Sequence, residues 1–541
     1  MNKIMKRLAP IALCVPLLFP LFSCGKESDE SFSGIAESSS GSVFESGYES
    51  GETGGTDEEK GVMRVLKLPD IVGEAEDLQA FIRQAEDKFS AQKNGIVVSP
   101  YYSVRINGEI LPVYATPTNY GSTQNITFID VSKDAFPLQV SVVADHAVTK
   151  AEILPTYYSV VCTVMANRVS FPVGHFGYYT VQFDGSYENV LTVAVREYEE
   201  PVVPEGYRLV EYKAGIHFVD SISLSSDTML YLHSGAYLIA EDPTGREEPE
   251  TAENYHGETQ WKPFLSAERT ENVIIAGRGV LDMSALYWCA RNPVEIGWSE
   301  NVTIDGLTIV NTANWNVTVH NSRNVEIRNV ILLSTRRNSD GIAIVDCDGA
   351  FVHDCFARSG DDLFEVKSMY ADSDVACRNI RFTDCIAWAD SCRCFGIIHE
   401  TARDISDVTF SRCATLYAMA EWSQDMGSLV VINGIRGTVS DITFRDIEVY
   451  CDKQYAVNVA TGPNEWSEGS TEIGKIRNVL YDNVRIVKGG GVRIKAPDDC
   501  KEIYIEGVVF RNIELCGKKA GSLSDLNILF VGDSKDVRYE E

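Results

Sequence analysis

A ten-residue segment recurs from about residue 270 toward the C-terminal end and limits the folds open to this chain. Examples are NVTIDGLTIV at 301, NVEIRNVILL at 324 and DITFRDIEVY at 441, and successive copies begin 23 to 37 residues apart. Repeats of this length indicate a solenoid, and copies with a strand-type period favour a β-helix. The nine copies that we identify begin at residues 272, 301, 324, 349, 379, 407, 441, 478 and 502.

The seventh position of the segment predicts the interior of this β-helix. Buried cysteine behaves as a small hydrophobe, so thiols in this column are expected to be reduced core residues. Although the chain has 14 cysteines, CRC at 392–394 lacks a second Cys/His pair at zinc spacing, and we assign no metal site. From the second copy onward the column holds Leu307, Val330, Cys355, Cys385, Cys413, Ile447, Val484 and Val508.

Shorter apolar strands lie between the repeated segments and should stack into one sheet, with one strand from each coil. Because each coil contributes one strand, residues at matching ends of successive strands should become neighbours in space. These strands are WNVTVH (315–320), GIAIV (341–345), LFEVK (363–367), CFGIIH (394–399), LVVING (429–434), YAVNVA (455–460) and GVRIK (491–495).

Three acids stand at the starts of two of these strands. Asp340 precedes one strand in NSDG, and 21 residues later Asp361 and Asp362 precede the next in GDD. We predict that Asp340 and Asp361 share one angular position in adjacent coils, about 4.8 Å apart, with Asp362 beside them. Such carboxyls repel, so at least one should stay protonated near neutral pH, as glycosidases require. Two strand-connecting turns, or a calcium cluster, are the alternative interpretations.

Five further residues are candidates for substrate contact near the acids. They are Asn338, Trp315, Lys367, Arg393 and His399. Trp315 suits stacking on a sugar ring and equally suits the β-core. Lys367 and Arg393 could bind substrate or only neutralise the acids. His399 has a structural interpretation as well as a functional one.

The N-terminal residues predict export and lipid anchoring. Lys3, Lys6 and Arg7 precede an apolar run at 8–22 that is short for a membrane span. The run ends in LFSC, which resembles the lipobox of bacterial lipoproteins, so residues 1–23 are expected to be cleaved and Cys24 lipidated. A flexible Ser/Gly/Glu-rich tether at 24–61 would then hold the folded part away from the membrane, outside the cytoplasm.

The remaining chain divides into two predicted domains. Residues 62–200 should form a short helix at 74–92 followed by a β-sandwich, because the apolar period changes to two after residue 95. Residues 201–541 should form the β-helix. The formal net charge of −30 argues against nucleic acid as a partner.

NSDG and GDD on a β-helix resemble glycoside hydrolase family 28, the polygalacturonases, and the related family 49, the dextranases and isopullulanases. The resemblance implies an all-β fold, with a β-sandwich followed by a right-handed parallel β-helix of the pectin-lyase type. It also implies inversion at the anomeric carbon, with Asp361 as general acid and Asp340 and Asp362 holding and deprotonating water. No cofactor is implied, and we expect a monomer.

Two departures from the polygalacturonase pattern bear on the substrate. Polygalacturonases carry Gly-His-Gly in the coil after the acid pair, where this chain has SCRCFGIIHE, and their Arg-Ile-Lys occurs here only at 493–495, about four coils away. We therefore predict a dextranase-like enzyme that acts on a neutral polysaccharide. The alternatives are a polygalacturonase-like pectin hydrolase, a non-catalytic glycan-binding surface protein, and a polysaccharide lyase.

Overall fold

The computed structural model describes residues 61–541 except 71, 88–89, 93–94, 119–120, 243–250, 254–258, 419–422, 424, 452–454, 468 and 498–501. The predicted signal segment, Cys24 and nearly all of the tether lie outside the described residues, so export and lipidation stay predictions. Within the described ranges, no helix combines the length and apolar character that crossing a membrane requires.

A β-sandwich forms the N-terminal part of the described chain, as predicted. One sheet has the order β2-β5-β6-β12-β11-β8 with β1 paired to β6, the other the order β4-β3-β7-β10-β9, and apolar side chains from both meet in one core. The strands are β1 (Met63–Val65), β2 (Val97–Val98), β3 (Tyr102–Ile106), β4 (Glu109–Leu111), β5 (Tyr114–Pro117), β6 (Thr123–Val131), β7 (Leu138–Ala144), β8 (Ala151–Leu154), β9 (Thr163–Met165), β10 (Arg168–Val173), β11 (Gly177–Phe183) and β12 (Leu191–Glu197).

The predicted helix exists but is shorter than 74–92. It comprises α1 (Leu78–Arg83) and the 3-10 turn η1 (Gln84–Glu86), and the Asp77 carboxylate caps its first turn. Gln92 explains the early end, because its side-chain amide donates to the carbonyls of Gln84 and Asp87. Its backbone N–H bonds the carbonyl of Ser284, which draws this segment onto the β-helix. The remaining 3-10 turns are η2 (Lys133–Ala135), η3 (Thr156–Tyr158) and η4 (Leu523–Leu526).

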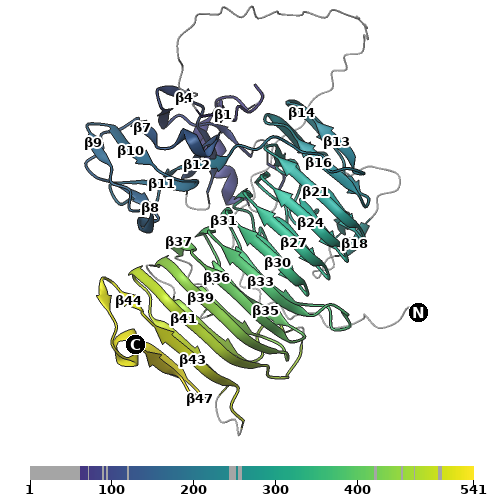
Figure 1. Ribbon diagram of the computed structural model, residues 1–541, viewed down its shortest axis with the longest axis vertical. Helices are drawn as coiled ribbons and strands as arrows, with labels where there is room; N and C mark the ends of the chain where they lie inside the picture. Colours follow the sequence, from purple (N-terminus) through teal and green to yellow (C-terminus); the bar gives the residue numbers. More distant parts are fainter. Residues whose placement is uncertain are drawn as a thin grey trace, which may run out of the picture. The chain divides into compact units, whose positions relative to one another are not determined.

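A right-handed parallel β-helix follows, and its strands stack coil upon coil (Figure 1). Most coils contribute two strands to a 23-stranded sheet and one to an 11-stranded sheet. The 11-stranded sheet confirms the predicted stack: β15 (Ile222–Leu224), β20 (Leu265–Glu268), β23 (Val294–Gly297), β26 (Val317–His320), β29 (Ile342–Val345), β32 (Phe364–Ser368), β35 (Phe395–Thr401), β38 (Gly427–Asn433), β40 (Tyr455–Thr461), β42 (Val492–Lys495) and β46 (Ile528–Val531).

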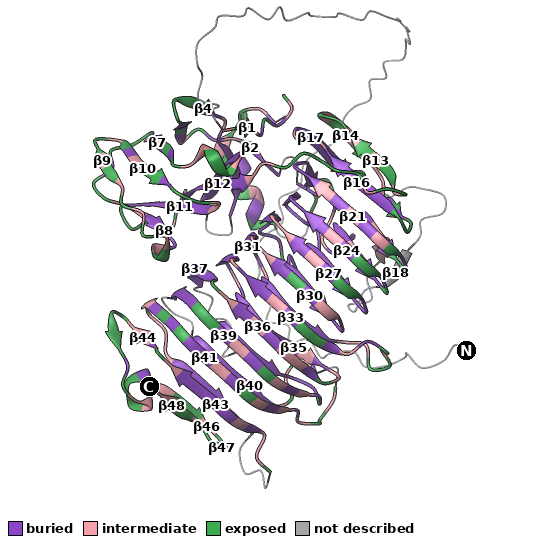
Figure 2. Cartoon of the chain, viewed as in Figure 1, coloured by how far each residue is buried: buried purple, intermediate pink, exposed green. Residues whose placement is uncertain are grey.

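The 23-stranded sheet contains the repeated segments, and buried and exposed residues alternate along it (Figure 2). A separate pair joins β18 (Thr251–Glu253) and β19 (Thr259–Trp261). The large sheet consists of β13 (Arg208–Tyr212), β14 (Gly215–Val219), β16 (Thr228–Leu232), β17 (Ala236–Ala240), β21 (Glu271–Gly277), β22 (Val280–Asp282), β24 (Glu300–Asp305), β25 (Thr308–Val310), β27 (Arg323–Arg328), β28 (Ile331–Leu333), β30 (Asp348–His353), β31 (Phe356–Ser359), β33 (Cys377–Thr383), β34 (Ile386–Ala389), β36 (Ile405–Ser411), β37 (Ala414–Ala418), β39 (Thr438–Tyr450), β41 (Lys475–Lys488), β43 (Ile505–Arg511), β44 (Glu514–Leu515), β45 (Lys518–Lys519), β47 (Ser534–Lys535) and β48 (Arg538–Glu540).

Two left-handed residues in each copy explain why the segment recurs. The first position has positive φ at Asn272, Asn301, Asn324, Gly349, Asn379, Asp407, Asp441, Asn478 and Gly507, and the sixth position has it as well. Asn, Asp and Gly tolerate this conformation better than other residues. The pairing of Val479 with Val508 places the last copy at Gly507 rather than 502, so Ile513 and not Val508 occupies its seventh position. Apolar residues alternate on both sides of Gly507, so the sequence fits a last copy that begins at 502 as well as one that begins at 507.

The seventh-position column is buried in one continuous core, as predicted. The first copy departs from it, because Arg278 turns to the sandwich and binds Asp130, which also pairs with Arg196. Apolar side chains of the sandwich pack on the β-helix beside this buried ion cluster, among them Phe128 and Tyr178 against Phe356.

The column cysteines are expected to remain thiols in the oxidising environment that export implies. Cys355, Cys385 and Cys413 are buried free thiols in successive coils. Stacked strands direct these side chains in parallel, which fits the disulfide dihedral angle poorly. Mass spectrometry after alkylation of the denatured, unreduced protein should find all three alkylated. A Cys355–Cys385 or Cys385–Cys413 crosslinked peptide would contradict this.

Candidate active site

The three predicted acids meet at the start of two neighbouring strands. Ile342 of β29 pairs with Phe364 of β32, so Asp340 stacks beside Asp362. The prediction that Asp340 shares its position with Asp361 is therefore wrong by one residue, because the register spans 22 residues and not 21. Asp340 and Asp362 are buried, and Asp361 is partly exposed.

A pocket of ≈ 650 Å³ contains all eight residues that the sequence selected for the site. They come from four successive coils, which the stacking of the 11-stranded sheet brings together. The pocket is lined by Trp315, Arg337, Asn338, Asp340, Gly360, Asp361, Asp362, Lys367, Met369, Ser391, Cys392, Arg393, His399, Glu400, Glu465 and Trp466.

Burial and mutual repulsion raise the pKa of two of the acids. Removal from water raises the pKa of Asp340 well above the ordinary value of 3.8, and the nearby charges of Asp361 and Glu365 raise it further. Removal from water and the adjacent Asp362 likewise raise the pKa of Asp361. Within the described residues, Oδ1 of Asp340 has no hydrogen-bond partner, so this oxygen is available to accept a proton or a hydrogen bond.

Arg393 forms a buried ion pair with the third acid. Its guanidinium Nη1 lies 2.9 Å from both oxygens of Asp362, and its backbone N–H donates to the same carboxylate. The guanidinium also donates to the carbonyl of Asp425. Of the two functions considered for Arg393, neutralising the acids is therefore the one that the contacts show.

Lys367 compensates two acids that the sequence analysis overlooked. Its ammonium lies 3.2 Å from Glu365 and 2.8 Å from Glu400, and it sits 5.0 Å above the Trp315 ring. Burial raises the pKa of Glu365 to about 8. A charged residue inside the apolar run LFEVK was the available signal for Glu365. Trp315 lines the pocket, which excludes the core-filling alternative.

A β-bulge brings His399 into the pocket from the far end of its strand. Val366 pairs with Ile397 but Ser368 pairs with Thr401, so extra residues of β35 are extruded, and His399 takes a left-handed φ of 57°. Asn464 accepts from the Trp466 N–H through its oxygen and therefore presents its NH₂ group to Nδ1 of His399. Burial and the cations Arg393 and Lys367 lower the pKa of His399 well below 6.5, so the ring is neutral with its proton on Nε2.

Two groups in or beside the pocket have the composition of cation sites, and protein cations already pair with two of their acids. Asp340, Asp362 and Glu365 bring carboxylate oxygens within 4.8 Å of one another, as do Asp361 and Asp362 with the Cys392 thiol. Arg393 pairs with Asp362 and Lys367 with Glu365, so protein cations compensate part of the charge of these groups. We assign no metal to these residues.

The family of the chain follows from its sequence. A model described as Glycosyl hydrolases family 28 matches residues 248–527, just over half of the chain, including all of the pocket residues. The chain belongs to glycosyl hydrolases family 28. It is therefore a member of a family of glycosidases, and the resemblance drawn from NSDG and GDD is confirmed.

Individual relatives of this family 28 member are distant. A probable polygalacturonase of Vitis vinifera is 29% identical over 192 residues, which cover 32% of this chain and only 39% of the relative. Dex49A from Penicillium minioluteum matches with a TM-score of 0.56 and 14% identity, over 86% of this chain and 97% of that one. An exopolygalacturonase from Thermotoga maritima matches with a TM-score of 0.42 and 18% identity, over 58% and 86% of the two chains. At these identities the likeness to Dex49A shows a shared fold.

The Arg-Ile-Lys at 493–495 does not serve this pocket. It lies on β42, four strands beyond β32 in the sheet, as the sequence predicted. Arg493 is buried, pairs with Asp425 at 3.1 Å and lies over the Tyr455 ring. Its contribution to the pocket is indirect, because the carbonyl of the same Asp425 accepts from Arg393.

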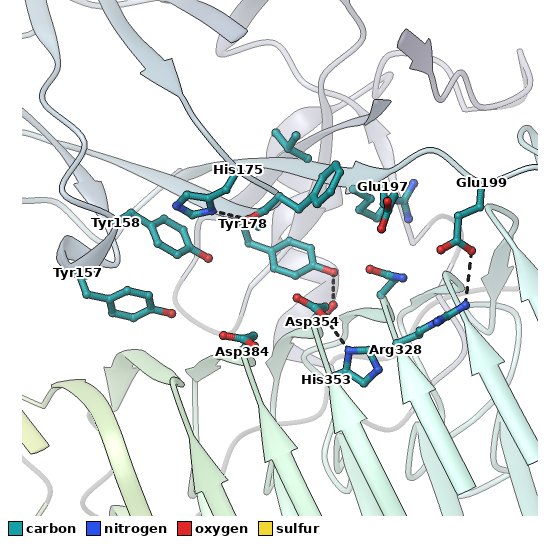
Figure 3. Close-up of a pocket in the computed structure, with 15 residues that line it drawn as sticks. Tyr157, Tyr158, His175, Tyr178, Glu197, Glu199, Arg328, His353, Asp354 and Asp384 are labelled. Carbon is teal, nitrogen blue, oxygen red and sulfur yellow. Dashed lines mark hydrogen bonds and ion pairs between the residues drawn. The ribbon is translucent and has the colours of Figure 1, made fainter. Parts of the chain in front are cut away.

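A second pocket of ≈ 300 Å³ lies between the sandwich and the β-helix, but its acids are paired (Figure 3). Asp354 contacts His353 at 2.6 Å, and Asp384 forms an ion pair with Arg412. Tyr178 donates its hydroxyl to the Asp354 carbonyl across the junction. These contacts join the two domains.

Proposed function

We propose that this chain hydrolyses glycosidic bonds of a polysaccharide by single displacement. Asp361 is the general acid, and Asp340 with Asp362 holds and deprotonates the attacking water. The observation that carries the proposal is the meeting of three carboxyls in unequal environments within one pocket. Unequal carboxyls supply a proton donor and a proton acceptor at the same pH.

Exposure and ion pairing assign the individual roles. A general acid must reach the glycosidic oxygen, and Asp361 is both partly exposed and raised in pKa. Arg393 binds both oxygens of Asp362, and we assign this paired carboxylate to accept the protons of water. Asp340 adds an oxygen without a partner among the described residues, and its raised pKa makes its ionised form a stronger base.

Single displacement is proposed despite the short distances between the acids. Asp340 and Asp362 approach within 4.8 Å, as do Asp361 and Asp362, whereas inverting enzymes usually separate their two carboxyls by roughly 6.5–9.5 Å. A retaining enzyme would need one of these acids to attack the anomeric carbon. Arg393 binds both oxygens of Asp362, so this carboxylate is poorly placed to attack.

Proton NMR of the first product should therefore show the anomer opposite to that of the substrate. A fresh digest recorded before mutarotation separates the two mechanisms. Accumulation of the anomer with retained configuration would contradict the proposal and would indicate an attacking carboxylate.

The preferred substrate is proposed to be a neutral polysaccharide such as dextran or pullulan. Lys367 and Arg393 are both committed to acids, and His399 presents a neutral N–H donor that suits a sugar hydroxyl. Polygalacturonate is the second candidate, favoured by the name of the Vitis vinifera relative and by the exposed Arg337 at the pocket. Arg337 stacks over Trp288 and would be the carboxylate-binding group.

Reducing-sugar assays on the three polymers distinguish the candidates. We expect turnover of dextran or pullulan to exceed that of polygalacturonate, and Arg337→Ala to leave the preferred activity within about twofold. Higher activity on polygalacturonate that falls with added salt and with Arg337→Ala would establish the second candidate instead.

A further inference from the structure

Cys392 is a pocket residue that the reaction scheme above does not use. It lies in the turn before β35, one coil beyond the acid pair, and it is buried. Its sulfur and the carboxylate oxygens of Asp361 and Asp362 lie within 4.8 Å of one another. A hydrogen bond from the thiol to the Asp361 side chain lowers the pKa of that carboxyl.

Three successive coils hold the carboxyl group of Asp361. The backbone N–H of Asn338 donates to Oδ2 from the preceding coil at 3.2 Å, and the N–H of Asp362 donates to Oδ1 from the same coil at 3.0 Å. Cys392 supplies the contact from the following coil. Because the other two donors are backbone groups, the thiol is the contact among these three that sequence can vary.

We propose that Cys392 is a positioning residue for the general acid: its thiol donates a hydrogen bond to Asp361 and holds that carboxyl toward the pocket. This inference rests on the proposed function, because it assumes that Asp361 delivers the proton. Asn338, Asp362 and the thiol together fix the carboxyl in one orientation. The thiol needs no ionisation for this role.

The charges around both groups fix the direction of the donation. Burial and the neighbouring Asp361 and Asp362 raise the pKa of the Cys392 thiol well above 9.0, so it keeps its proton and acts as the donor. The charged and titratable groups that face Asp361 are Asp340, Asp362, Cys392 and Arg393. Cys392 and Arg393 favour the ionised form of Asp361, whereas burial and Asp362 oppose it.

Removing the thiol should therefore raise the pKa of Asp361 further. A general acid loses activity as pH rises through its pKa, so the alkaline limb of the kcat/KM profile should move to higher pH. We expect Cys392→Ala to shift that limb upward by roughly half a pH unit, and to lower kcat at the optimum by less than about tenfold, because a thiol is a weak donor. Cys392→Ser retains a donor and should restore the limb.

Cys394→Ala is the matched control, because Cys394 is a buried thiol two residues away that faces the interior core. Its alkaline limb should match that of the parent. If Cys392→Ala does not fold, Cys392→Val removes the donor with a side chain closer in size to cysteine. The inference would be overturned if Cys392→Ala or Cys392→Val kept the alkaline limb of the parent's kcat/KM profile. It would also be overturned if the limb of Cys392→Ser moved as far as that of Cys392→Ala. Full activity of Asp361→Asn would instead overturn the proposed function.

Discussion

Replacing Asp361 by Asn is expected to lower kcat/KM by roughly 10²- to 10⁴-fold, because the amide cannot deliver a proton to the leaving oxygen. Asp340→Asn and Asp362→Asn should show losses of similar size, since each removes an acceptor for the protons of the attacking water. Asparagine keeps the volume of aspartate, so the packing of these partly or fully buried positions is retained. The measurement is initial-rate kinetics on the preferred polymer.

The stabilities of the same variants should diverge. Asp340 has a raised pKa in the folded protein, so its ionisation opposes folding as pH rises through that value, and Asp340→Asn should be at least as stable as the parent at pH 8. Asp362→Asn removes the partner of Arg393 and should be less stable than the parent.

Asp384→Asn is the control for the kinetic experiment. Asp384 is an acid of the junction pocket, so this variant should retain activity. Near-parental turnover in all three active-site variants would show that the site is elsewhere.

The sequence predicted those parts of the fold that short, repeated sequence patterns indicate. The repeated segment and the period-two strands recur in successive coils, so the β-helix and the residues at its strand starts could be predicted. All eight selected site residues line one pocket for this reason. The sequence does not define which residues pair between neighbouring coils, because the connections between coils vary in length. Asp340 consequently pairs with Asp362 rather than Asp361, and the last copy begins five residues later than predicted.

Features that depend on distant segments were missed or misjudged. Trp466 and Glu465 reach the pocket from a connection far along the chain, and no repeat or spacing in the sequence indicates this. The bulge that turns His399 into the pocket interrupts the alternation of the strand. An interruption of this kind gives no repeating pattern by which the sequence could predict it. The helix ends early because Gln92 bonds Ser284 of the β-helix, which is a tertiary contact.

Arg393→Ala should cost the fold roughly 3–5 kcal/mol, because it leaves the Asp362 carboxylate buried without its partner. The side chains of the two residues are 3% and 5% exposed, so water cannot replace the guanidinium. Urea unfolding at neutral pH measures the loss. The matched control is Arg412→Ala, which removes a similar pair with Asp384 in neighbouring coils, but with side chains that are 59% and 37% exposed. That variant should lose less than about 1 kcal/mol, since solvent screens exposed pairs.

A double-mutant cycle separates the ion pair from the lost volume of the arginine. Asp362→Asn with Arg393→Ala leaves neither charge buried alone, so the double variant should be more stable than the sum of the single losses predicts, by roughly 1–3 kcal/mol. Strict additivity would mean that Arg393 acts through packing and its bond to the Asp425 carbonyl. Activity should not return in the double variant, because Asn at 362 cannot accept the proton of water. Arg393 is therefore expected to affect the proposed reaction through its ion pair with Asp362.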